Sequence, residues 1–188
     1  HLREVADALD RSVRRLRDIR VVLVGPEETR AAFENLLAPQ TRAAVVGWAS
    51  AEAHVEPPGL LEAARPLLEE WRAGHEDALL ARWREEAARH GRAAAGWEET
   101  LQAASEGRVE VLLVQPGADR PAFVCPACGR AQAVDGSCPL DGATVQPAGT
   151  GLDLAVHQTL AHGGKVEVLG EGRRDLEPVG GVAALLRF

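Results

Sequence analysis

The chain has 188 residues, of which 46% are hydrophobic and 26% charged, and its formal net charge at pH 7 is −7. This length and composition are typical of one or two globular domains with a buried core. The acidic balance argues against a protein that coats nucleic acid, and no apolar run is long enough to span a bilayer. Three cysteines, two of them in a C-x-x-C motif, indicate a cytoplasmic protein with a metal site rather than a disulfide framework.

The first part of the chain predicts a small α/β unit. Apolar residues at helical spacing from Leu2 to Leu16 predict an amphipathic helix. A strand is expected in "RVVLVG", a helix in "PEETRAAFENLL" and a second strand in "RAAVVGW". Strand, helix and strand at these lengths are typical of an α/β fold.

A long helix is expected from Leu60 to about His90, after a break at "EPPG". Pro66 and Gly74 interrupt its apolar stripe, and they weaken a helix interior by roughly 3 and 1 kcal/mol relative to alanine. We therefore expect a kink, or a hand-over between two domains, near Gly74.

The second half repeats the α/β pattern. Helices are expected in "GWEETLQAASEG" and "GLDLAVHQTLAHGG", the second ending at Gly163. Strands are expected in "RVEVLLV", "PAFVC", "KVEVLG" and "GGVAALLRF". The chain begins at His1 and contains no methionine, so we also expect it to be a fragment of a longer protein.

The stretch "CPACGRAQAVDGSCPLDG", residues 125–142, contains nearly the same turn twice. The first copy contributes Cys125 and Cys128, while the second pairs Cys138 with Asp141, which stands where a fourth cysteine is expected. Zinc takes four tetrahedral ligands, and thiolate, imidazole and carboxylate all serve. We therefore predict a structural zinc site at these four residues, weaker than a four-cysteine site because a carboxylate is a harder ligand.

Two alternatives to this ligand set remain open. The segment can fold without a stable metal, or His157 or His162 can supply the fourth ligand. A different cluster, His54 with Glu52 and Glu56, is interpreted as a polar loop rather than an acid/base pair. Because no base and no open coordination position is expected near the cysteines, a metal here would be structural.

An arginine-rich helix end is the best candidate for a polyanion contact. The stretch "RSVRRLRDIR" contains Arg11, Arg14, Arg15 and Arg17, and several arginines within two turns can bind phosphate groups. The alternative is a solvated helix face with internal ion pairs. No Walker loop, dinucleotide fingerprint, nucleophile elbow or zinc-protease motif occurs in the sequence.

The order of these pieces resembles archaeo-eukaryotic class 1 release factors. "GWEETLQAASEGRVEVLLV" resembles the start of their third domain, and "GGKVEVLGEGRRDLEPVGGVAALLRF" resembles its end. The cysteine segment resembles the C-x-x-C pairs that archaeal members carry at this place. "HLREVADALDRSVRRLRDIRVVLVGPEETRAAFENLL" resembles the later part of the middle domain, and the alanine- and arginine-rich style resembles a bacterial branch of the family.

The resemblance implies two α/β sandwich domains. Residues 1–73 would be part of a ribonuclease H-like middle domain, and residues 74–188 a ribosomal-protein-like α/β/α domain with a zinc-knuckle insertion at 125–142. It also implies contacts with the ribosome and its tRNA and rRNA, and with a translational GTPase. The Gly-Gly-Gln loop of release factors occurs nowhere in the 188 residues, so no catalytic residue is assigned.

The resulting hypothesis is a ribosome-binding protein that acts in translation termination, in rescue of stalled ribosomes, or in hibernation on idle ones. One alternative is a peptidyl-tRNA hydrolase or nuclease whose active loop lies upstream of this sequence. A third interpretation is a stress-linked interaction module that keeps the fold without the ribosome.

Overall fold

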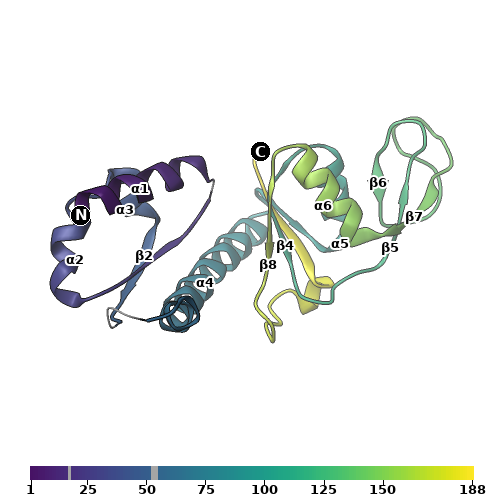
Figure 1. The fold of residues 1–188 in the computed structure, drawn as a ribbon. Coiled ribbons are helices and arrows are strands. Elements are labelled where there is room, and N and C mark those ends of the chain that lie inside the picture. The colour runs from purple at the N-terminus through teal and green to yellow at the C-terminus, as the bar shows by residue number, and fades with distance from the viewer. Residues whose placement is uncertain (17, 52–54) are drawn as a thin grey trace. The chain divides into compact units, whose positions relative to one another are not determined.

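The computed structural model of the protein describes residues 1–16, 18–51 and 55–188. The chain divides into two compact units, His1–His75 (unit 1) and Glu76–Phe188 (unit 2), and Figure 1 labels elements of both where there is room. The sequence analysis placed its boundary after residue 73.

The long helix α4 (Pro57–Ala88) contains the division between the two units. It begins earlier than expected, because proline is tolerated in the first turn of a helix, where its missing N–H would have no partner. It then continues through Pro66 and Gly74 without interruption in its helical assignment. Of the two expectations near Gly74, a kink or a hand-over between domains, the division between the two units falls one residue further on, after His75.

Unit 1 is built around two parallel strands. Before α4 it contains α1 (Leu2–Arg15), β1 (Val21–Val24), α2 (Glu27–Glu34), α3 (Pro39–Ala44) and β2 (Val45–Ala49). Parallel strands need a crossover connection, and α2 and α3 supply it between β1 and β2. Leu23 and Phe33 are buried in the core of this unit, and Trp48 meets Phe33 edge-on with ring centroids 6.5 Å apart.

The sequence prediction misplaced two boundaries in unit 1. Residues 42–44 were expected in a strand, but they form the end of α3, and the strand begins at Val45. Pro39 explains the difference, because its fixed φ favours the first position of a helix. The preceding helix, α2, also ends at Glu34 rather than at Leu37.

Unit 2 is organised around a mixed four-stranded sheet in the order β3-β9-β4-β8. Its elements after α4 are β3 (Ala93–Ala95), α5 (Gly96–Ser105), β4 (Val109–Val114), β5 (Pro121–Val124), β6 (Ala131–Gln132), β7 (Gln146–Thr150), α6 (Gly151–Ala161), β8 (Lys165–Val168), the 3₁₀ turn η1 (Glu177–Val179) and β9 (Val182–Leu186). β4 runs parallel to β8 and antiparallel to β9, and β3 pairs with β9. A separate small sheet, β6-β5-β7, carries the cysteine segment.

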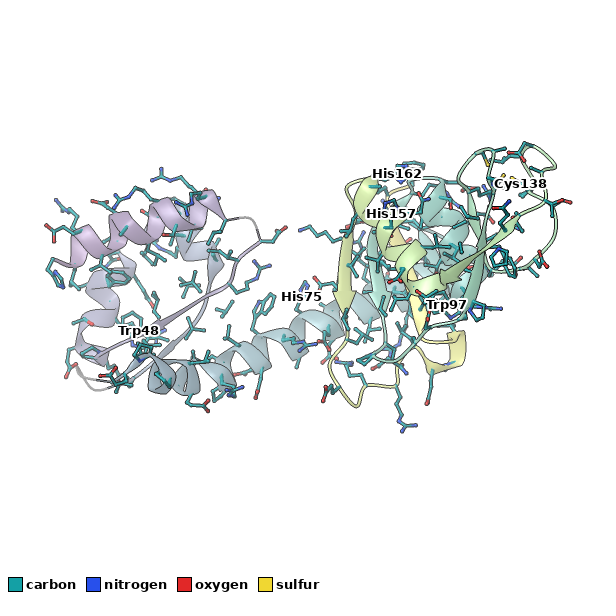
Figure 2. The ribbon with its side chains drawn as sticks, turned by 45° about the vertical axis from the view of Figure 1, so that its right-hand side comes forward. Trp48, His75, Trp97, Cys138, His157 and His162 are labelled. Atoms are coloured by element: carbon teal, nitrogen blue, oxygen red, sulfur yellow. The ribbon has the colours of Figure 1, made fainter. Side chains whose placement is uncertain are left out.

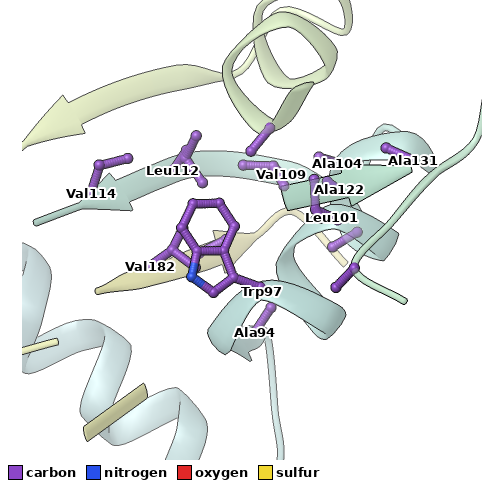
Figure 3. Packing of buried hydrophobic residues seen from close by; sticks show 14 of the residues in the cluster. Ala94, Trp97, Leu101, Ala104, Val109, Leu112, Val114, Ala122, Ala131 and Val182 are labelled. Atoms are coloured by element: carbon purple, nitrogen blue, oxygen red, sulfur yellow. The ribbon is translucent and has the colours of Figure 1, made fainter. Parts of the chain in front are cut away.

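Helices cover both faces of the four-stranded sheet. On one face Leu112 packs in a cluster with Trp97 of α5, beneath α5 and α6 (Figure 3). On the other face Leu113 packs with Leu80 and Trp83 of α4. Neighbouring strand residues point to opposite faces, so both faces of the central strands are apolar and buried. This layering confirms the predicted α/β fold class.

The loop after β8 is held on the unit 2 part of α4 by charged side chains. Arg173 donates from Nε to Asp175 Oδ2 at 2.8 Å and from Nη2 to Asp77 Oδ1 at 2.7 Å. Arg84 donates to the other oxygen of Asp175 at 2.6 Å. Hydrogen bonding from Arg173, with a further bond from Arg84, holds the pKa of Asp175 below its usual range although partial burial opposes this.

Replacing Asp175 by asparagine is expected to lower the stability of unit 2 by about 1–2 kcal/mol at neutral pH, because a bond to a charged acceptor is weakened. The pKa of Asp175 is depressed in the folded state, so its contribution is present above the unfolded aspartate pKa of about 3.9 and lost as the pH falls further. Chemical denaturation from pH 7 to pH 2 should therefore show a shallower acid loss for the variant. Glu171→Gln, an exposed charge removal in the same loop, is the control and should change neither quantity.

Candidate metal centre and arginine cluster

The cysteine segment forms two turns with the same backbone hydrogen bonds. In the first, Gly129 N–H donates to the Cys125 carbonyl at 2.9 Å, and Cys125 N–H donates to the carbonyl of residue 130 at 2.9 Å. In the second, Gly142 N–H donates to the Cys138 carbonyl at 2.9 Å, and Cys138 N–H donates to the carbonyl of residue 143 at 2.8 Å. Both glycines have a φ near +75°, which favours glycine over any other residue. The sequence repeat is thus a repeat in structure.

The two turns bring four side chains together. One donor atom from each of Cys125, Cys128, Cys138 and Asp141 lies within 4.8 Å of all the others. The Cys128 and Cys138 sulfurs are 3.6 Å apart, and the Cys125 sulfur lies 3.4 and 3.5 Å from the two carboxylate oxygens of Asp141. Three sulfurs and one carboxylate converging from two turns fit the tetrahedral coordination that zinc adopts in structural sites.

The backbone prepares this cluster for a cation. The Ala143 N–H donates to Asp141 Oδ1 at 2.9 Å and lowers the pKa of that carboxyl group. The Leu140 N–H lowers the pKa of Cys138. Cys128 also receives a backbone N–H, from Arg130, but burial and the neighbouring acidic groups outweigh it and raise its pKa to about 12. Without a cation, the cluster therefore resists full deprotonation, because its negative charges repel one another.

The knuckle, residues 121–150, is fastened to the helices of unit 2 by polar side chains. Ser105 at the end of α5 accepts the Ala131 N–H at 2.9 Å. Arg130 forms an ion pair with Glu106 at 3.2 Å, and Gln158 of α6 donates to the Gly129 carbonyl at 3.2 Å. These anchors lie outside the cysteine motif, and no spacing rule in the sequence indicates them.

The histidine alternatives lie elsewhere. Figure 2 shows His157 on α6 and His162 at its end, whereas Cys138 lies in the loops of the knuckle. His157 is exposed, and His162 Nδ1 contacts the Gln158 carbonyl at 2.9 Å. The cluster that the described residues form therefore contains Asp141 and no histidine. The His54 cluster cannot be compared with the structure, because residues 52–54 lie outside the part described.

Replacing Asp141 by alanine is expected to lower zinc affinity at least about tenfold, because one of four converging donors is lost. Asp141→Cys, which restores the repeated turn, should instead bind zinc more tightly, because a thiolate is the softer ligand. Metal analysis of the purified proteins, followed by competition with a chelator, measures both effects. Unchanged zinc retention by Asp141→Ala would show that the aspartate is not a ligand.

The arginine cluster lies at the end of α1. Arg11, Arg14 and Arg15 are exposed, and Arg14 and Arg15 follow Arg11 by three and four residues, which places each of them next to Arg11 on the helix surface. Within the described residues, none of these three forms an ion pair with an acidic side chain, and Arg14 Nε donates to the Asp10 carbonyl at 3.2 Å. Arg17 falls outside the residues that the structure describes.

An aromatic stack near this cluster was not predicted. The guanidinium of Arg20 lies over the ring of Trp71, 4.6 Å from its centroid, and His75 stacks on Trp71 at 5.0 Å with an interplanar angle of 12°. The cation–π contact joins residues far apart in the sequence, so no local spacing could indicate it.

No family model and no curated protein sequence matches the chain. Solved structures do. A ribosome-bound archaeal Pelota, solved as a model with ABCE1, matches with a TM-score of 0.64 and 21% identity, over 100% of this chain and 48% of that one. Dom34 from S. cerevisiae, described as a translation termination-like factor that interacts with Hbs1, matches with a TM-score of 0.57 and 12% identity, over 100% and 51%.

The chain has the fold of these factors. Both belong to the archaeo-eukaryotic release factor family, which the sequence motifs resemble. The chain spans about half the length of the solved structures that it matches. At these identities the likeness establishes the mixed α/β fold and its element order. No described helix of the protein is long and apolar enough to cross a membrane.

Proposed function

We propose that this chain is the ribosome-binding part of a release-factor-like protein that acts in the cytoplasm on stalled or terminating ribosomes. The observation that carries the proposal is the match of its fold, over the whole chain, to a Pelota in its ribosome-bound form. The order of sequence motifs supports the same conclusion independently, and the composition supports a place in the bacterial branch of the family.

The arginine cluster supplies the contact with RNA in this proposal. Arg11, Arg14 and Arg15 present planar guanidinium groups that are not engaged by acidic side chains of the described residues, and such groups can form paired bonds to phosphate oxygens. Arg17 extends the cluster in the sequence. Because the net charge of the chain is −7, binding must depend on this local concentration of charge rather than on the whole surface.

Unit 2 is assigned to protein partners. Dom34 interacts with Hbs1, a translational GTPase, so a GTPase of that kind is the class of partner we propose. A zinc ion in the knuckle would hold its two turns together and supply no chemistry. The proposal assigns binding to these residues and no catalytic step.

Cosedimentation with 70S ribosomes tests the proposal directly. We expect the protein to pellet with ribosomes stalled at the end of a truncated message, at moderate salt, and to dissociate as the salt is raised. Parallel reactions with ribosomes at a stop codon and with vacant ribosomes separate rescue from termination and from hibernation. Protein that remains in the supernatant with all three at low salt would contradict the proposal.

The hydrolase alternative has a separate readout in the same reactions. Release of labelled peptide from peptidyl-tRNA by the chain would assign it a catalytic role, whereas binding without release supports the binding role proposed here.

A further inference from the structure

We propose that Cys128 and Cys138 form a redox modification site, at which a peroxide converts the metal-binding knuckle into a metal-free, disulfide-bonded form. The proposal rests on the geometry of the cysteine cluster and does not depend on ribosome binding. The two sulfurs are 3.6 Å apart, and Cys128 is exposed while Cys138 is 2% exposed. Cys128 is the solvent-exposed residue of the pair, and a bound zinc would hold its sulfur as the thiolate that reacts with peroxide.

The third cysteine is protected from this reaction. Cys125 is 1% exposed, and its sulfur contacts the two carboxylate oxygens of Asp141 at 3.5 and 3.4 Å. It also lies in the small core of the knuckle with Val145 and Phe123. The burial of Cys125 and its contact with Asp141 therefore favour the Cys128–Cys138 disulfide among the three pairings that three cysteines allow.

The reaction balances with peroxide as the oxidant. The Cys128 sulfur attacks one oxygen of the peroxide, the O–O bond breaks, and a sulfenic acid and water form. The Cys138 sulfur then attacks the sulfenic sulfur, the S–O bond breaks, and a second water leaves as the disulfide forms. Two electrons pass from the two sulfurs to one hydrogen peroxide. In the zinc-bound form the sulfurs are thiolates, so solvent supplies the two protons that the two waters need, and zinc leaves as the divalent ion. The sulfurs must approach by about 1.5 Å to reach bonding distance.

Because Asp141 takes the place of a fourth cysteine, a single disulfide is enough to dismantle the metal site. A carboxylate cannot be oxidised to a disulfide, so a site with three cysteines can form only one bridge. That bridge removes two of four ligands at once and leaves a single thiol and a single carboxylate, which are too few to retain zinc. Because Cys125 keeps its thiol, a dithiol reductant and zinc should restore the original site.

Loss of the metal has a structural consequence for the surface of unit 2. Cys125 and Cys138 themselves belong to the small core cluster around the two turns, whose third buried residue is Val145. A module with so few buried side chains depends on a metal or a cross-link to hold its fold. Replacement of the metal by a disulfide should rearrange the second turn, which contains Asp141. The hydrogen bonds of Ser105 should still hold β6 on α5.

Peroxide treatment of the zinc-loaded full chain tests the proposal. We expect release of one zinc per chain, measured with a chromophoric chelator, and one intramolecular disulfide, identified by peptide mass mapping as Cys128–Cys138. Cys125 should remain open to alkylation. A dithiol reductant with added zinc should reverse both changes.

Two variants test disulfide formation without requiring the protein to bind zinc. In metal-free protein, Cys128→Ser should form no disulfide with Cys138 under peroxide, because one sulfur of the reactive pair is absent. Cys125→Ser retains the reactive pair and should still form the disulfide in metal-free protein. A bridge that contains Cys125, a bridge between chains, or zinc release without any disulfide would overturn the proposal, whatever the outcome of ribosome binding.

Discussion

Replacing Trp97 by alanine is expected to destabilise unit 2 by about 3–5 kcal/mol, the range for truncation of a buried aromatic side chain. The indole is 6% exposed and packs beneath β4 and β9 in the cluster of Figure 3. Its Nε1 donates to the Gly180 carbonyl at 2.9 Å, and its ring lies 3.1 Å from the position of a Cβ at Gly151. One side chain therefore joins α5, the start of α6 and the turn before β9.

Urea denaturation followed by far-UV circular dichroism measures this loss. Trp97→Phe separates its two causes, since it keeps most of the apolar contact and removes the hydrogen bond, and it should cost about 1–3 kcal/mol. Leu160→Ala, at a side chain that is 55% exposed on α6, should change stability by less than about 0.5 kcal/mol. Equal losses for Trp97→Ala and Leu160→Ala would show that the cluster of Figure 3 does not stabilise the unit.

The elements that the sequence predicts well are those whose apolar pattern is set by two-sided burial. β9 is a continuous run of valine, alanine and leucine, β4 is valine and leucine apart from Glu110, and α5 carries an apolar stripe with acids in its first turn. β3, by contrast, is three alanines, and β6 and β7 are rich in alanine, glutamine, glycine and proline. Such residues have low β propensity, so these strands form because a neighbouring strand offers hydrogen bonds, which no local pattern can show.

The candidate site likewise combines features that the local sequence indicates with features that depend on tertiary structure. The spacing of Cys125, Cys128 and Cys138 indicated the metal centre, because each turn is a local structure of a few residues. The fourth ligand stayed open between an aspartate, a histidine and no metal, since that choice depends on how the two turns face each other. The Ser105 anchor and the contact of Arg20 with Trp71 depend on tertiary structure alone.

Replacing Arg11, Arg14 and Arg15 together by glutamine is expected to weaken ribosome binding at least about tenfold at low salt. Each arginine that contacts a phosphate displaces about one condensed cation, so the slope of log affinity against log salt should fall by up to about three. The fold should be unaffected, because these side chains are exposed and form no ion pair within the described residues. Cosedimentation over a series of salt concentrations measures the affinity and the slope together.

A matched triple variant, Arg65, Arg89 and Arg174 to glutamine, removes the same charge from other exposed positions. Each of these arginines forms a surface ion pair, which contributes little to stability, so the variant should remain folded. If position matters, the matched variant keeps the salt slope of the unmodified chain and the α1 variant does not. If both triples shift binding equally, net charge alone governs the association, and α1 is only a solvated helix face.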